Sequence, residues 1–177
     1  IVIGTLLGSC ISLLKYLADP YNQLPAITFW LLGSLSSITV MDLVSLLPGV
    51  LVGLIPLWLL RWRMNVMTLS EEEALTLGVD TRRMRLAVVT AATLMTAAVV
   101  SVSGIIGWIG LLIPHFGRLL VGPDFGRLLP AAMLLGAGYL VAVDTLARTI
   151  APLEIPLGVL TAFIGAPFFI WLLAVSR

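Results

Sequence analysis

The side chains that could take part in chemistry are few and widely separated in this sequence. His115 is the only histidine, and a transition-metal site needs several ligands, so a lone imidazole in an apolar segment is more often structural than metal-binding. There is no H-E-x-x-H motif, and neither Ser101 nor Ser103 has an evident triad partner. We therefore expect no catalytic residue, no metal site and no cofactor.

A site for the phosphates of ATP is also missing. The P-loop motif G-x-x-x-x-G-K-S/T needs a lysine, and the single lysine, Lys15, lies in the sequence LLKYL. This sequence is therefore not expected to hydrolyse ATP by itself. Cys10 is the single cysteine, which excludes an intrachain disulfide.

The composition is typical of an integral membrane protein. Hydrophobic residues make up 60% of the chain and charged residues only 11%, and the mean hydropathy is +1.13. A net charge of +1 provides no concentrated basic surface, so we do not expect nucleic acid as a partner. These numbers predict an all-α, polytopic bundle of transmembrane helices in a lipid bilayer.

The spacing of the charges predicts six membrane crossings. Most intervals without charge fit one helix across roughly 30 Å of hydrocarbon, at about 1.5 Å per residue. The interval from Leu86 to Gly117 has 32 residues and is interrupted in its second half by Gly104, Gly107, Gly110 and Pro114, so it should fold back on itself. The predicted crossings are residues 1–16, 43–61, 86–106, 108–121, 129–147 and 157–175.

The basic residues give these crossings an orientation, because short loops rich in Arg and Lys stay on the cytoplasmic side of a membrane. Six crossings leave Lys15 and Arg148 outside. The other basic residues then share the cytoplasmic side: Arg61, Arg63, Arg82, Arg83, Arg85, Arg118, Arg127 and Arg177. Residues 17–42 become an outer, periplasmic connection with a short helix along the membrane interface.

Residues 61–85 contain nine of the nineteen Asp, Glu, Lys and Arg residues, between two apolar stretches. Ser70 followed by three glutamates predicts a helix with a capping box, in which Glu73 is the acid at the third position. Gly78 suits a left-handed C-cap after Leu77, and Asp80 can cap a second short helix from Thr81 to Arg85. The sequence predicts two short helices joined at Gly78, projecting below the membrane; these residues alone are equally compatible with an ordinary solvated loop.

Asp144 and Arg148 lie four residues apart on one predicted helix, with the acid on the N-terminal side, which is the favourable order for an intrahelical pair. On these residues alone, the pair is interpreted as a structural ion pair near the outer interface. Pro167 lies within the last predicted crossing. Prolines there more often bend a helix than act as a hinge.

The order of several motifs resembles the FecCD family of importer permeases. Glu73, Ala74 and Gly78 match the E-A-x-x-x-G pattern of its ATPase-docking loop. The segment from Gly104 to Leu173 matches almost without a break, through four elements: IPH-x-x-R at Ile113–Arg118, D-x-x-A-R at Asp144–Arg148, E-x-P-x-G at Glu154–Gly158 and GAPFF at Gly165–Phe169.

The resemblance implies a ten-helix permease fold of which this chain is the C-terminal part, the fifth through the tenth helix; the chain also begins as a fragment would. It implies coupling helices within 62–85 and a multi-pass location in a bacterial or archaeal cell membrane. The implied cargo is a ferric siderophore, haem, cobalamin or a similar compound; molybdate remains possible. The last crossing would line the path, which makes Pro167 a possible hinge.

The resemblance also implies partners and contact residues. The partners are two copies of a separate ATPase, a second permease copy that is identical or paralogous, and an extracytoplasmic substrate-binding protein that docks on Arg148, with Asp144 fixing its rotamer. The implied ATPase-coupling residues are Ser70, Glu73, Ala74, Leu77, Gly78, Val79, Asp80, Arg82 and Arg83.

Two other classes of function compete with this interpretation. A secondary transporter driven by an ion gradient needs ionisable residues or unwound helices near the middle of the bilayer, whereas every Asp, Glu, Lys and Arg here lies near the end of a predicted helix. An intramembrane enzyme lacks a nucleophile, a base or a metal cluster. The secondary transporter is therefore the main alternative.

Overall fold

The computed structural model describes residues 2–151 and 153–175, and the described residues fold into helices without a strand. The all-α expectation is therefore confirmed. The elements are α1 (Val2–Leu17), α2 (Gln23–Leu32), α3 (Val40–Leu60), the 3-10 helix η1 (Arg63–Thr68), α4 (Glu71–Thr76), α5 (Thr81–Ser103), α6 (Ile109–Val121), α7 (Phe125–Thr149) and α8 (Leu157–Val175).

A helix occupies each of the six segments that the charge spacing marked as crossings. Among the described residues, α3, α5 and α7 are long and apolar enough to cross a membrane by themselves. The long interval after Leu86 folds back as expected, between α5 and α6. Helix α6 has 13 residues and so covers only about 20 Å. A complete crossing of roughly 30 Å must therefore include residues that flank α6 in the chain.

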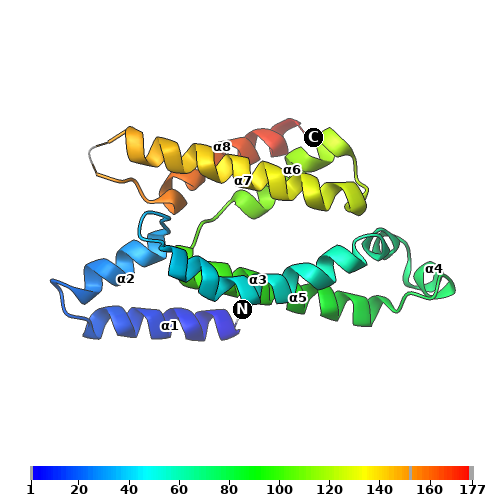
Figure 1. The fold of residues 1–177 in the computed structure, drawn as a ribbon, viewed down its shortest axis with the longest axis horizontal. Helices are drawn as coiled ribbons and strands as arrows, with labels where there is room; N and C mark the ends of the chain where they lie inside the picture. The colour runs from blue at the N-terminus through cyan, green and yellow to red at the C-terminus, as the bar shows by residue number, and fades with distance from the viewer. Residues whose placement is uncertain (1, 152, 176–177) are drawn as a thin grey trace.

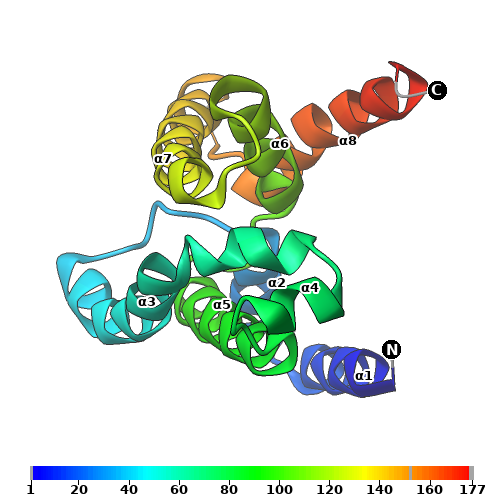
Figure 2. The ribbon, with the colours of Figure 1, turned by 90° about the vertical axis from the view of Figure 1, so that its right-hand side faces the viewer.

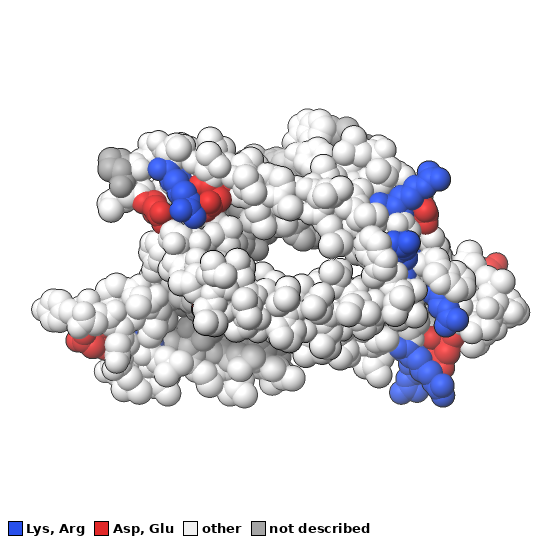
Figure 3. Space-filling view, in the orientation of Figure 1, with Lys and Arg blue, Asp and Glu red and all other residues white. Residues whose placement is uncertain are grey.

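The helices form two layers (Figures 1 and 2). Helices α3 and α5 pack along each other in one layer, and α6, α7 and α8 make the second. The described part of α1 buries none of its side chains, and Figure 2 shows α1 and α8 on the same side of the molecule. Figure 3 shows an opening through the molecule between the two layers.

Charges gather at the two ends of the molecule, with an apolar band between them (Figure 3). One group surrounds the end that carries α4, and the other covers the opposite end. Large apolar side chains such as Val52, Leu134 and Val141 are exposed on the helices between the two groups. Such a band would be unfavourable in water and matches the hydrocarbon of a bilayer. Arg177 lies outside the described residues.

The prediction of a separate second short helix from Thr81 to Arg85 is wrong. Helix α5 starts at Thr81, behind its N-cap Asp80, and continues without a break to Ser103. The reason is local, because no glycine or proline lies between Thr81 and Ser103 to end a helix once it has begun. Of the region 62–85, the structure forms η1, α4 and the first turn of α5.

Three stretches of backbone meet at the end opposite α4, at Gly33, Gly104 and Gly158, which we call the glycine junction. The Ser34 amide donates to the Ser103 carbonyl at 3.0 Å, and the Leu157 amide donates to the Gly33 carbonyl at 2.9 Å. A Cβ at Gly158 would clash with the carbonyl oxygens of Leu32 and Ile105. The junction therefore joins α2, the α5–α6 loop and the start of α8 through close backbone contact.

Candidate functional site

Helix α4 begins in the way that its sequence predicts. Ser70 is the N-cap; its hydroxyl accepts from the Glu73 amide at 3.3 Å, and a Glu73 carboxylate oxygen accepts from the Ser70 amide at 3.1 Å. This reciprocal capping box satisfies two amides that a helix start leaves unpaired. Because α4 has only six residues, such caps contribute much of what keeps it helical.

Helix α4 ends in a Schellman motif around Gly78. The Gly78 amide donates to the Leu75 carbonyl and the Val79 amide donates to the Ala74 carbonyl, each at 2.9 Å. Gly78 has a φ of 75°, in the left-handed region that glycine enters without a steric penalty. The left-handed C-cap predicted at Gly78 is therefore confirmed.

The predicted coupling residues divide into a buried and an exposed set. Ala74 is fully buried and Val79 is buried, so both hold α4 in place rather than presenting a surface. Leu77 is 62% exposed and so is available to a partner. The rest of the predicted set is exposed: Ser70, Glu73, Gly78, Asp80, Arg82 and Arg83.

Leu75, which sequence reasoning missed, is 60% exposed beside Leu77. The sequence feature that could have identified Leu75 is an apolar residue within the charged segment 61–85. Two large leucines, one in α4 and one at its C-cap, are thus exposed together in a charged environment.

The connection from α4 to α5 is polar. The Thr81 hydroxyl donates to a Glu71 carboxylate oxygen at 3.5 Å. Asp80 accepts from the Arg83 amide and forms an exposed ion pair with the Arg83 guanidinium at 3.1 Å. Exposed ion pairs contribute little energy, so the capping bonds and buried Ala74 define the geometry here.

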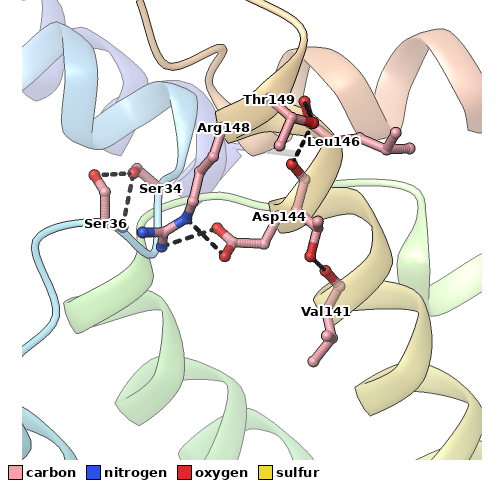
Figure 4. Close-up of polar contacts among 8 residues, drawn as sticks. Ser34, Ser36, Val141, Asp144, Leu146, Arg148 and Thr149 are labelled. Atoms are coloured by element: carbon pink, nitrogen blue, oxygen red, sulfur yellow. Dashed lines mark hydrogen bonds and ion pairs between the residues drawn. The ribbon is translucent and has the colours of Figure 1, made fainter.

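The opposite end of the molecule carries the pair Asp144 and Arg148 (Figure 4). Arg148 Nε donates to Asp144 Oδ2 at 2.9 Å and its Nη2 donates to Oδ1 at 3.2 Å. This two-pronged contact fixes the plane of the guanidinium. The guanidinium points toward Ser34 and Ser36 of the loop after α2, whose hydroxyls lie 2.9 Å apart. Helix α7 thus presents a half-exposed, oriented arginine beside two serines.

Pro167 and His115 lie on helices that face each other around Trp108. Pro167 is inside α8 and lines an open apolar cavity of about 630 Å³, together with Trp108 and Phe163. His115 packs edge-on against Phe168, with ring centroids 6.2 Å apart. Across residues 2–151 and 153–175 no three His, Cys, Asp or Glu side chains are grouped as metal ligands.

Asn65, on η1, is a second residue that sequence reasoning missed. Its side-chain amide donates to Asp124, the N-cap of α7, and its side-chain oxygen accepts from the Phe125 amide. Hydrogen bonds from Asn65 and then from the Gly126 amide lower the pKa of Asp124 below its ordinary value. No local signal could have revealed this contact, because its two sides are 59 residues apart in the sequence.

Comparisons with known proteins agree with this arrangement. Residues 1–175 match the model of the FecCD transport family. The chain is 41% identical over all of its 177 residues to a Helicobacter pylori protein named "Probable iron chelatin transport system permease protein", of which it covers 54%. It is 41% identical over 168 residues, 95% of its length, to the molybdate import system permease protein MolB of Haemophilus influenzae, of which it covers 50%.

A solved structure matches the fold closely. It is described as an inward-facing conformation of a metal-chelate type ABC transporter, and the match has a TM-score of 0.90 with 41% sequence identity. The match covers 95% of this chain and 55% of that one. The chain thus spans about half the length of the relatives it matches. By sequence over nearly all of its residues and by fold, this chain is a membrane protein that belongs to the FecCD transport family.

Proposed function

We propose that this chain forms the C-terminal part of the permease of an ATP-driven importer, which moves a metal chelate into the cell while a separate ATPase supplies the energy. The observation that carries the proposal is α4. This short helix is capped at both ends, is packed through the buried Ala74, and exposes Leu75 and Leu77 at a charged end of the molecule. Such a helix suits the transfer of force from a soluble partner, because it moves as a unit when a partner presses on it.

The positions of the charges favour this function over a secondary transporter. In the part of the chain that the structure describes, the acidic and basic residues of α3, α5 and α7 lie near the helix ends. An ion-coupled carrier would need ionisable groups or broken helices at mid-membrane depth. The absence of a P-loop lysine in the sequence is consistent with ATP hydrolysis by another chain.

The Arg148 end supports a second partner, a substrate-binding protein on the outer side of the membrane. Asp144 holds the guanidinium of Arg148 in one orientation, so less side-chain entropy would be lost when an acidic residue of the partner binds. Ser34 and Ser36 add hydroxyls to the same rim. In this proposal two ATPase copies and a second permease copy, identical or paralogous, complete the assembly.

The cargo is proposed only as a class. The relatives include one named for iron chelatin and one named for molybdate, at the same identity to this chain. The cavity beside Pro167 is lined mostly by apolar side chains, which suits a bulky chelate handled through shape and weak contacts. Selection among cargoes then belongs mainly to the binding protein.

Co-purification of the ATPase with the permease tests the proposal. Leu77→Glu places a charge on the exposed surface of the α4 region, and the lost burial of one leucine, about 1.5–3 kcal/mol, corresponds to roughly 10–100-fold weaker binding. The matched control is Leu153→Glu, at an exposed leucine near the Arg148 end. Loss of the ATPase from the Leu77 variant alone is the expected result. Equal ATPase retention in both variants and in wild type would contradict the proposal.

A further inference from the structure

The two helical layers are in contact at both ends of the molecule. The glycine junction joins them at one end, and an opening separates them in the middle (Figure 3). At the α4 end, the contact is made by Asn65 of η1 and Asp124, the N-cap of α7. We call this contact the Asn65–Asp124 link.

In this link, Asn65 contacts both the Asp124 side chain and the backbone at the start of α7. Asn65 Nδ2 donates to Asp124 Oδ1 at 2.5 Å, and Asn65 Oδ1 accepts from the Phe125 amide at 2.7 Å. Asp124 Oδ1 also accepts from the Gly126 amide, and Arg127 lies 4.0 Å from its other oxygen. One asparagine therefore holds the N-cap and the first residue of α7 together, and a hydrogen bond to a carboxylate is stronger than one between neutral groups.

Asn65 is firmly attached to α4. The Thr68 hydroxyl donates to the Asn65 carbonyl at 2.7 Å, and the Leu69 amide closes η1 on the Val66 carbonyl immediately before Ser70. Helix α4 packs against both η1 and α5, around the buried Ala74. A displacement of α4 would therefore move Asn65 with it.

The route from α4 to the second layer through α5 is long. It follows α5 for 23 residues, about 34 Å, and then passes through the glycine junction. The three ion pairs in the described residues cannot provide a shortcut, because each joins residues three or four positions apart on one element. The Asn65–Asp124 link instead joins the two layers directly, beside α4.

We propose that the Asn65–Asp124 link carries the displacement of α4 to the layer of α6, α7 and α8, an inference that rests on the proposed function. Helix α7 runs from this link past Arg148 to Thr149, over 25 residues or about 37 Å. A push on α4 then shifts α7 as one rod, so that the end that faces the ATPase and the end that faces the binding protein move together. Asn65 is a positioning residue and touches no substrate.

An exchange of the two side chains tests the link in the complete transporter, reconstituted with its ATPase and binding protein. Asn65→Asp sets two carboxylates against each other and should separate them. Asn65→Asp combined with Asp124→Asn again pairs an amide with a carboxylate and leaves an acceptor for the Phe125 amide. The readout is the amount of cargo imported per ATP hydrolysed. A role confined to folding would change the amount of assembled transporter instead.

We expect Asn65→Asp to lower import per ATP at least tenfold while the ATPase remains bound, and the exchanged pair to restore it to within threefold of wild type. Asn65→Ala removes both contacts without adding charge and should also lower the ratio at least tenfold, which keeps the test available if the first variant fails to accumulate. Asn22→Asp is the matched control, because Asn22 makes no capping bond through its side chain. It should leave the ratio unchanged.

Two results would overturn the proposed role of the link. One is import per ATP within twofold of wild type in both Asn65 variants. The other is a loss of import per ATP that the exchanged pair fails to restore. Either result leaves the proposed function intact if wild-type import still depends on ATP and on the bound ATPase. If the wild-type protein instead imports without the ATPase, the proposed function fails and the link fails with it.

Discussion

Gly78 determines how the chain leaves α4. Its positive φ lets the amides of Gly78 and Val79 turn back onto the last carbonyls of the helix, and Val79 then buries its side chain close to Ala74. Nothing lies within 4 Å of a Cβ built at Gly78, so the requirement for glycine comes from the backbone conformation and not from space. A single residue thereby sets the angle between the exposed leucines and α5.

Gly78→Ala should weaken ATPase binding. A left-handed conformation costs a residue with a Cβ about 1–2 kcal/mol, enough to shift the α4 end away from its bound geometry and reduce affinity roughly 5–30-fold. Titration of the ATPase onto the permease in nanodiscs measures this. Gly138→Ala is the control, because Gly138 lies within α7 with nothing within 4 Å and should bind as wild type. Equal affinities for the two variants would disprove the role of Gly78.

At the scale of elements, the two ends of the molecule are built differently. The α4 end depends on side-chain hydrogen bonds, at the two caps of α4 and at Asn65. The opposite end depends on close backbone approach at the glycine junction, where side chains would not fit. Close backbone packing of the second kind allows little displacement. The glycine junction therefore holds the layers together by shape, whereas the α4 end is held by the hydrogen bonds of Asn65.

Gly158→Ala should loosen the glycine junction. The new Cβ would clash with two backbone carbonyls, of Leu32 and Ile105, and overpacking of this kind costs about 1–3 kcal/mol. The expected result is a lower midpoint of thermal unfolding for the permease in nanodiscs, together with proteolysis in the loop after α2. Gly136→Ala, whose Cβ would meet Ile113 Cγ2 at an ordinary 3.8 Å, should unfold like wild type. An unchanged midpoint in Gly158→Ala would refute the tight junction.

At the scale of the whole molecule, the charged ends and the apolar band place the long helices across a bilayer. The eight-to-two distribution of basic residues then predicts that α4 is cytoplasmic and that Arg148 lies outside. Every proposal about partners depends on this orientation, because ATP is available only on the cytoplasmic side.

Thiol labelling in intact cells tests the orientation. Cys10→Ser removes the single cysteine, after which Thr76→Cys and Leu153→Cys each provide one exposed thiol at opposite ends. A membrane-impermeant maleimide should modify the Leu153 variant in intact cells and the Thr76 variant only after the cells are permeabilised. The reverse pattern would invert the topology and refute the ATPase site on α4.

The sequence by itself determined the membrane class, the positions of the six helical segments, the capping box at Ser70 and the turn at Gly78. These depend on hydropathy over a window of residues or on contacts between residues at most five apart, such as the bond from Val79 to Ala74. The FecCD motifs also lay in the sequence, as an ordered set. The error at Thr81–Arg85 was local as well, since the absence of a helix breaker up to Ser103 predicts one continuous α5.

Only the tertiary structure decided that Ala74 is buried while Leu75 and Leu77 are exposed, that Gly158 contacts the α2 and α5–α6 backbones, and that Asn65 holds the N-terminus of α7. The physical reason is the distance along the chain. Helical periodicity and capping act over a few residues, whereas the packing that selects a buried face, or brings Asn65 to Asp124, depends on how separate helices meet.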